Sequence, residues 1–166
     1  MTSYNMAEGY FLDAEKYIHE GDIKAAKQLL EELLAIEPAY GPAHNHMGWI
    51  YHTKLTNYSM AAKHFKLAQR FAPRYPAGYM NYIYLLAEIG NYQEMSRVME
   101  QAVTVPGIDK SILAYEYAKC FEAKADWKWA KHYYKEAIKL TQLDEVLVAC
   151  KEALRRIRLK RWYGLW

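Results

Sequence analysis

The sequence predicts an all-α protein built from four copies of a two-helix hairpin, followed by a fifth helical segment. The first observation behind this prediction is a repeat of 34 or 35 residues that runs through most of the 166-residue chain. The second is a pair of small residues in most repeats, spaced so that two helices can approach each other closely. The third is a proline or glycine near the end of each of the first three repeats, where a helix stops.

The second helix of each repeat contains a small or flexible residue that returns after 35, 34 and 35 positions. These four residues are Ala26, Ala61, Met95 and Ala130. An apolar residue stands three positions before each of them, and a large one stands four positions after, as Leu30, Phe65, Met99 and Tyr134. The first helices align in the same way, through Ala14, Gly48, Ile83 and Ala118. The large residue is expected to fill the space beside the small ones, and each hairpin then leaves an apolar face for the next to cover.

Turn residues fix the expected ends of the helices. Gly21 and Gly90 are suited to end two first helices in the left-handed conformation. Pro38 and Pro73 are placed to end the first two repeats, because proline cannot continue a helix. Residues 143–161 have one apolar face and one charged face, which is typical of a helix that caps a stack and keeps it soluble. Thr141 and Asp144 have the spacing of a capping box at the start of this helix.

Residues 7–142 resemble the tetratricopeptide repeat (TPR) family in period, in the small and large positions, and in the closing prolines. The resemblance implies a right-handed superhelical solenoid of four TPR-like hairpins with a C-terminal capping helix. It also implies that residues 1–166 form a single domain. The expected segments are repeats at about 7–40, 41–75, 76–109 and 110–142, the cap helix 143–161 and an aromatic tail 162–166.

Composition indicates an intracellular protein with an apolar core. Hydrophobic residues make up 52% of the chain and charged residues 25%. The two cysteines, Cys120 and Cys150, fall in apolar helical stretches and are expected to be buried thiols in a reducing compartment. The sequence has neither a signal peptide nor an apolar run of membrane-spanning length, so a cytoplasmic location is expected. Met1 and the polar cap helix favour a complete chain.

The net charge of +3 is distributed unevenly. Residues 1–37 carry a net charge of −5, residues 38–87 carry +5, and residues 143–166 carry +3. Lys63, Lys66 and Arg70 share one face of a predicted helix in the second repeat. This face is either an ordinary solvated surface or a patch for an acidic peptide or nucleic acid.

The residue patterns exclude the common catalytic motifs. There is no Gly-rich phosphate loop and no Gly-x-Ser-x-Gly elbow. His44 and His46 lie two positions apart, so on a helix they point to nearly opposite sides and cannot share a metal ion. Glu15 and His19 have the spacing of an ordinary surface pair. We therefore expect a protein that is not an enzyme and needs neither a cofactor nor a metal.

The resemblance implies a peptide-binding groove lined by the first helix of each repeat. Aromatic, methionine and asparagine side chains suit such a groove, since they offer a large contact area together with hydrogen bonds to a peptide backbone. The predicted groove residues are Phe11, Leu12, Glu15, Asn45, Trp49, Met80, Asn81, Tyr84, Tyr115 and Lys119. The predicted function is non-catalytic protein–protein interaction, with a protein or peptide segment bound in this groove.

The aromatic tail supports an alternative function. Trp162, Tyr163 and Trp166 follow a run of basic residues at the end of the cap helix. The tail can fold back on its own stack, dock into another copy of the chain, or touch an anionic membrane surface. Docking into another copy, helped by the acidic first repeat, would make the protein a self-assembling structural unit. RNA binding along the basic second repeat is a third, weaker hypothesis, because the corresponding groove positions share no common polar residue type.

Overall fold

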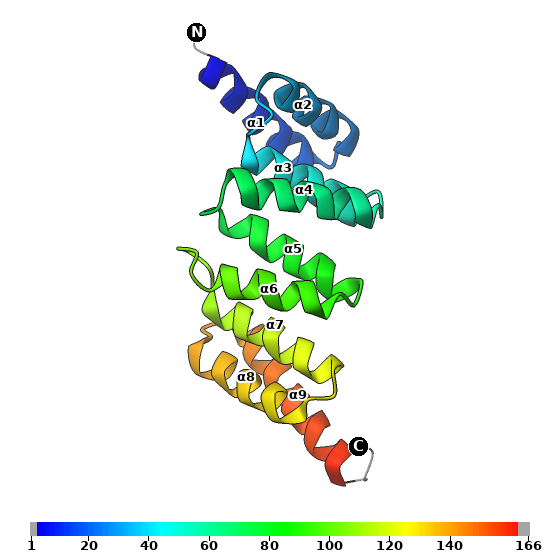
Figure 1. The fold of residues 1–166 in the computed structure, drawn as a ribbon, viewed down its shortest axis with the longest axis vertical. Helices are drawn as coiled ribbons and strands as arrows, with labels where there is room; N and C mark the ends of the chain where they lie inside the picture. Colours follow the sequence, from blue (N-terminus) through cyan, green and yellow to red (C-terminus); the bar gives the residue numbers. More distant parts are fainter. Residues whose placement is uncertain (1–2, 163–166) are drawn as a thin grey trace. The chain divides into compact units, whose positions relative to one another are not determined.

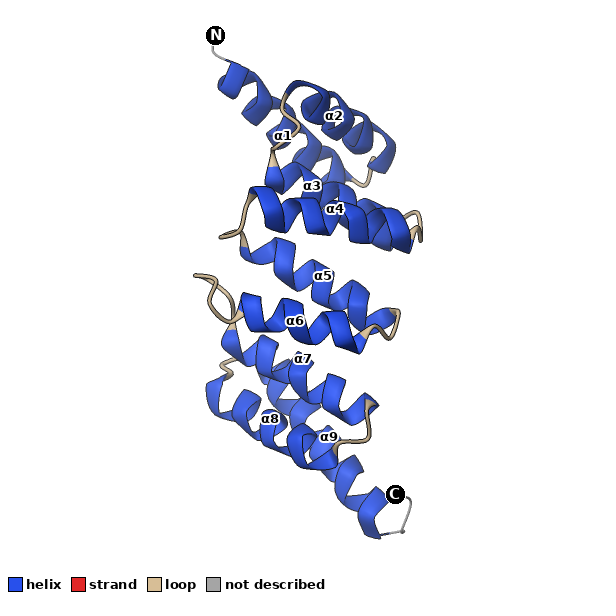
Figure 2. Ribbon diagram, in the orientation of Figure 1, coloured by secondary structure: helices blue, strands red, loops and turns tan. Residues whose placement is uncertain are grey.

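The computed structural model describes residues 3–162, with side chains placed for residues 6–160 and 162. Within these residues every regular element is a helix (Figures 1 and 2). The helices are α1 (Ser3–Glu20), α2 (Ile23–Ile36), α3 (Gly41–Thr53), α4 (Tyr58–Phe71), α5 (Pro76–Glu88), α6 (Tyr92–Ala102), α7 (Lys110–Ala123), α8 (Trp127–Leu140) and α9 (Asp144–Trp162). The predicted all-α fold of helical hairpins is confirmed. None of these helices combines the length and the apolar character needed to cross a membrane.

The helices pack into two compact units, Met1–Ile89 and Gly90–Trp166. In unit 1, α1 packs on α2 and α3 packs on α4, while α5 lies against both α3 and α4. In unit 2, α7 packs on α8, α9 covers both of these helices, and α6 contacts α7. The boundary between the units falls at the turn between α5 and α6, where Gly90 follows Ile89.

The turns inside the four hairpins share one construction. The last residue of the turn after each first helix has a positive φ, at Gly21 (85°), Thr56 (48°), Gly90 (70°) and Ala125 (57°). The next residue caps the second helix by accepting a hydrogen bond from a backbone N–H three positions on, at Asp22, Asn57, Asn91 and Asp126. Such side chains satisfy helix N–H groups that have no partner inside the helix. The left-handed conformation predicted for the two glycines is confirmed.

Thr56 is the residue least suited to this turn, because a β-branched side chain is strained at positive φ. We expect Thr56→Gly to raise the free energy of unfolding by about 1 kcal/mol. Chemical denaturation monitored by circular dichroism measures this change. Thr53→Gly is the matched control, since Thr53 lies in α3 and glycine there should lower stability by about 0.5 kcal/mol. A loss of stability in Thr56→Gly would contradict the proposed strain.

The small repeat positions lie where the two helices of a hairpin meet. Ala14, Ala26, Ala61, Ala118 and Ala130 are completely buried. Gly48 shows why small residues are needed, since a Cβ atom built there would lie 2.6 Å from the ring of Phe65. The predicted use of small residues at close helix contacts is therefore confirmed.

The cap helix α9 completes the core of unit 2. Its buried residues Val146, Cys150, Ala153 and Ile157 join a cluster with α7 and α8 residues that includes Tyr134. Both cysteines are buried free thiols, as predicted, and burial raises the pKa of Cys150 to about 11.

The predicted capping box at the start of α9 is wrong. Thr141 is the C-terminal cap of α8, and α9 begins only at Asp144. The Thr141 hydroxyl accepts a hydrogen bond from the N–H of Leu143 (3.0 Å) inside the connecting turn. At the other end of α9, Trp162 is 84% exposed. The tail residues Tyr163 and Trp166 lie outside the described residues.

Candidate functional site

The first helices α1, α3 and α5 of unit 1 are joined by side-chain contacts at the predicted groove positions. The ring of Phe11 on α1 meets the imidazole of His46 on α3 edge-on, with centroids 5.0 Å apart. Glu15 also contacts His46, with 3.4 Å between Oε1 and Nε2. Glu15 thus pairs across to α3 rather than with His19, the partner suggested by the sequence. We call the surface of α1, α3 and α5 around these contacts the first-helix face.

An asparagine pair continues this line of contacts from α3 to α5. The Nδ2 group of Asn81 donates a hydrogen bond to Oδ1 of Asn45 at 2.9 Å. Asn45 is only 3% exposed, so it supports the face from beneath. Asn81 is half-buried, and among the described residues nothing donates a hydrogen bond to its side-chain oxygen. Asn81 therefore retains an acceptor for a ligand.

Large apolar side chains lie next to these contacts. Leu12 is 57% exposed and Tyr84 is 39% exposed, while Trp49, Met80 and Phe11 are half-buried. The ammonium group of Lys54 lies 5.2 Å from the ring centroid of Trp49. Eight of the predicted groove residues thus belong to unit 1 and its three first helices.

Behind this face, α3 and α4 are joined by a histidine pair that the sequence analysis did not identify. Nδ1 of His44 lies 3.0 Å from Nδ1 of His64, and Nε2 of His44 lies 3.0 Å from the carbonyl oxygen of Pro38. A carbonyl only accepts, so His44 must carry its proton on Nε2, and His64 donates from Nδ1 to His44. Burial lowers the pKa of both imidazoles, and for His64 the pKa falls to about 4.

A second polar cluster joins α3 and α4 to the end of α5. One carboxylate oxygen of Glu88 accepts a hydrogen bond from the Tyr58 hydroxyl (2.7 Å), and the other lies 2.7 Å from Nε2 of His52. These bonds lower the pKa of the Glu88 carboxyl, with the Tyr58 bond the larger cause. The cluster fixes the end of α5 against the preceding hairpin.

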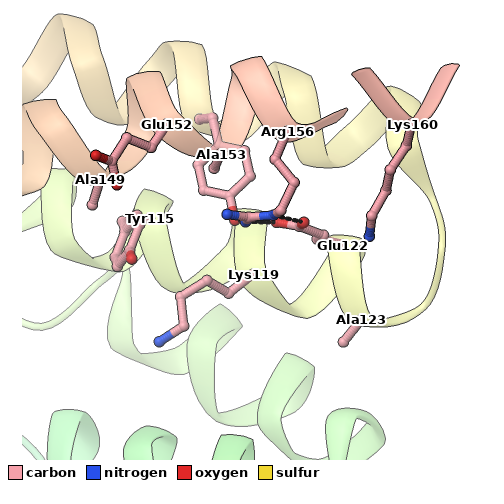
Figure 3. Close-up of a pocket in the computed structure, with 10 residues that line it drawn as sticks. Tyr115, Lys119, Glu122, Ala123, Ala149, Glu152, Ala153, Arg156 and Lys160 are labelled. Atoms are coloured by element: carbon pink, nitrogen blue, oxygen red, sulfur yellow. Dashed lines mark hydrogen bonds and ion pairs between the residues drawn. The ribbon is translucent and has the colours of Figure 1, made fainter. Parts of the chain in front are cut away.

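Unit 2 contains a separate open pocket of about 500 Å³ between α7 and α9 (Figure 3). Two predicted groove residues, Tyr115 and Lys119, line its α7 side. Lys119 bonds both carboxylate oxygens of the buried Glu116, at 3.0 and 2.9 Å. Its ammonium group also lies 5.3 Å from the ring centroid of Tyr115. One face of the Tyr115 ring is therefore partly covered by the ammonium group of Lys119.

An ion pair across the pocket ties α9 to α7. The guanidinium group of Arg156 donates to both oxygens of Glu122, at 2.9 and 2.8 Å, as the dashed lines in Figure 3 show. The buried Tyr134 hydroxyl also donates to Glu122, at 2.6 Å. Burial alone would raise the pKa of Glu122, but the bonds from Arg156 and Tyr134 outweigh it and lower that pKa. Burial, reinforced by Glu122, raises the pKa of Tyr134.

The described residues contain no group of three or more histidine, cysteine, aspartate or glutamate side chains placed to hold a metal ion. In the pair of His44 and His64, both Nδ1 atoms and Nε2 of His44 are used in hydrogen bonding, so the pair is an interhelical contact. The polar clusters of this fold connect one helix to another.

No protein-family model matches the sequence, and no curated protein matches it. Solved structures do match the fold. One is PilW, described as a widely conserved type IV pilus biogenesis factor (TM-score 0.71, 19% identity over 81% of this chain). Another is TTC0263, described as a thermophilic TPR protein of Thermus thermophilus (TM-score 0.70, 18% identity, 89% of this chain and 81% of that one). A third is human IFIT1, solved as a dimer with the RNA PPP-AAAA (TM-score 0.79, 18% identity, 97% of this chain).

These similarities show that the chain has the all-α solenoid fold of the TPR family. The chain spans 61% of the PilW chain and 40% of the IFIT1 chain, so the larger proteins contain structure that has no counterpart here. At these identities the likeness concerns the fold, and the binding site has to be argued from this chain's own residues.

Proposed function

We propose that this protein is a non-catalytic interaction scaffold whose first-helix face in unit 1 binds an extended segment of a protein partner. The observation that carries the proposal is a set of side-chain contacts between successive first helices. Phe11 and Glu15 on α1 contact His46 on α3. Asn81 on α5 donates a hydrogen bond to Asn45 on α3. These contacts hold three successive first helices in register beneath the exposed apolar side chains. The cytoplasmic location stays a prediction.

The chemistry of the face favours a partner segment with apolar side chains. Leu12, Trp49 and Tyr84 offer apolar and aromatic area, which supplies most of the binding energy in protein interfaces. The side-chain oxygen of Asn81 is placed to accept a hydrogen bond from a peptide N–H. Because α1, α3 and α5 are held in place before binding, the partner bears most of the ordering cost.

Peptides selected from a random library on the intact protein test this proposal. For peptides that bind, we expect Trp49→Ala and Leu12→Ala each to weaken the affinity by about tenfold or more, since a residue at the centre of an interface contributes about 1–2 kcal/mol or more. Fluorescence anisotropy with labelled peptides measures the affinity. Circular dichroism checks that each variant retains its helices.

Two matched controls use exposed side chains of unit 2, which do not belong to this face. Leu140 is 51% exposed on α8, so Leu140→Ala removes an equally exposed leucine from unit 2. Trp162→Ala does the same for tryptophan. If the selected peptides bind all four variants equally, the first-helix face is not the binding surface.

Self-assembly is the second candidate, and the exposure of Trp162 favours it. An indole that is 84% exposed beside a basic helix end is costly to leave in water and suits a contact with another copy. We expect light scattering to show a mass that rises with concentration for the full chain. A chain that ends at Arg161 should remain a monomer. Monomeric full-length protein at all concentrations would rule out this role.

A further inference from the structure

The outward surface of α8 in unit 2 carries a cluster of basic side chains. Lys128, Lys131, His132 and Lys135 line a shallow surface recess of about 410 Å³. At 100° per residue, these four positions fall on one side of the helix. We call them the basic face of α8.

The positive charge of this face comes from its three lysines. Among the described residues, Lys128 and Lys135 are exposed and have no ion-pair partner. The one acidic residue within α8, Glu136, is paired with Lys139 at 2.6 Å. Asp126, just before the helix, accepts a hydrogen bond from the N–H of Trp129 as the N-cap. A recess lined by three lysines and a histidine, with no acidic side chain, is complementary to an anionic ligand.

An exposed indole flanks the basic face. Trp129 is 44% exposed, and its ring meets that of His132 edge-on, with centroids 5.3 Å apart. On its inner side, Trp129 lies 6.1 Å from Phe121 and 6.0 Å from Tyr133. Tyr133 is stacked on Phe121 in turn, at 5.5 Å with only 4° between the planes. This aromatic layer holds the indole in a fixed orientation beside the lysines.

Further positive charge lies at the edge of the aromatic layer. The ammonium group of Lys124 is 5.9 Å from the ring centroid of Phe121. Cations interleaved with a pre-positioned aromatic ring are the combination that binds single strands, since lysines contact phosphates and rings stack on bases. An acidic peptide would use the lysines and leave the indole without a role. A membrane would require several apolar side chains at the centre of the face, where lysines stand instead.

We propose that the basic face of α8, together with Trp129, binds single-stranded nucleic acid. Phosphates contact Lys128, Lys131 and Lys135, and one base stacks on the exposed part of the Trp129 ring. The site lies on the second helix of its hairpin in unit 2 and shares no residue with the first-helix face of unit 1, so the two proposals are tested separately. Sequence preference is expected to be weak, because stacking and phosphate contacts are available to every base.

The test measures binding of a fluorescein-labelled oligo(dT) of about 12 nucleotides to the full chain by fluorescence anisotropy. We expect binding at low salt that weakens steeply as salt is added. Lys135→Glu should weaken it by about fivefold or more and reduce the salt dependence. Trp129→Leu should also weaken it by about fivefold or more, because leucine fills much of the space but offers no ring for stacking.

Each of these two variants has a matched control, one with the same change of charge and one with the same loss of an aromatic ring. Lys151→Glu alters the net charge equally on the exposed side of α9, and Trp162→Leu removes an exposed tryptophan from the end of α9. Both should leave the affinity within about twofold of the unchanged protein. Circular dichroism confirms that the variants remain helical.

Three results would overturn the proposal. The first is no binding of the oligonucleotide at low salt. The second is an equal loss in Lys135→Glu and Lys151→Glu, which would mean attraction by overall charge. The third is displacement of the oligonucleotide by polyglutamate or phosphatidylserine vesicles with no effect of Trp129→Leu, which would identify a charge-selective surface for another anionic partner.

Discussion

Replacing Gly48 with valine is expected to lower the free energy of unfolding by about 2 kcal/mol or more. Gly48 lies in the middle of α3, and a Cβ atom there would stand 2.6 Å from two ring carbons of Phe65 on α4. Phe65 is completely buried, so its ring has no free space into which to move. Valine is a better helix former than glycine by about 0.5 kcal/mol, which offsets only a small part of the cost.

Gly9→Val is the matched control for this prediction. Gly9 lies in α1, and a Cβ atom built there meets nothing within 4 Å. The control should be neutral or slightly stabilising, because only the helix-propensity change remains. Urea denaturation followed by circular dichroism measures both variants.

A double-mutant cycle identifies the clash as the cause. Phe65→Leu makes room beside Gly48 at its own cost of about 1–2 kcal/mol. In that background, Gly48→Val should cost at least about 1 kcal/mol less than in the unchanged protein. An equal cost in both backgrounds would show that the contact between Gly48 and Phe65 does not set the requirement for glycine.

Unit 1 is expected to lose about 1–2 kcal/mol of stability between pH 6.5 and pH 4 through the pair of His44 and His64. In the folded protein the pKa of His64 is lowered to about 4, first by burial, then by His44 and by Lys63. In the unfolded chain a histidine has a pKa near 6.5. The expected loss of stability is smaller than the free energy that corresponds to the full pKa shift. The reason is that the His64 side chain is only half-buried, so water partly screens its charge.

The direction of the effect follows from proton binding. Between pH 6.5 and pH 4 the unfolded chain binds more protons than the folded protein, so acid favours unfolding. The histidine contribution is therefore complete above about pH 6.5 and is lost as the pH falls toward 4. The surroundings of His64 do little to oppose this, since Glu31 on α2 favours the charged form while Lys27 and Lys63 disfavour it. Protonation of both imidazoles would also break the bond between their Nδ1 atoms.

Hydrogen exchange of α3 and α4 amides at pH 7 and pH 5 measures this loss within unit 1. His64→Leu should flatten the pH dependence in this window, although the variant loses some stability at pH 7 because Nδ1 of His44 then lacks a hydrogen-bond donor. His19→Gln, which removes an exposed histidine from α1, should leave the pH dependence unchanged. An unaltered pH dependence in His64→Leu would exclude the histidine pair as its source.

The sequence by itself determined the repeat and the local geometry of each hairpin. Ala26, Ala61 and Ala130 recur at a nearly fixed period, and small residues at these positions allow close helix packing. Gly21 and Gly90 mark their turns because few residue types adopt a positive φ. Thr56 and Ala125 occupy the equivalent turn positions in the other two hairpins without a sequence signal, since the rest of each hairpin imposes the conformation.

Only the tertiary structure decided which polar side chains face each other. His44 and His64 lie 20 residues apart, Asn45 and Asn81 lie 36 apart, and Glu122 and Arg156 lie 34 apart. Each of these side chains had several candidate partners in the sequence, and helix periodicity does not choose between them. The choice depends on how far one helix is shifted along its neighbour, which is set by the packing of large residues such as Phe65 against small ones. Asn45 is consequently buried beneath Asn81 rather than open to a ligand, because α5 covers α3 at that position.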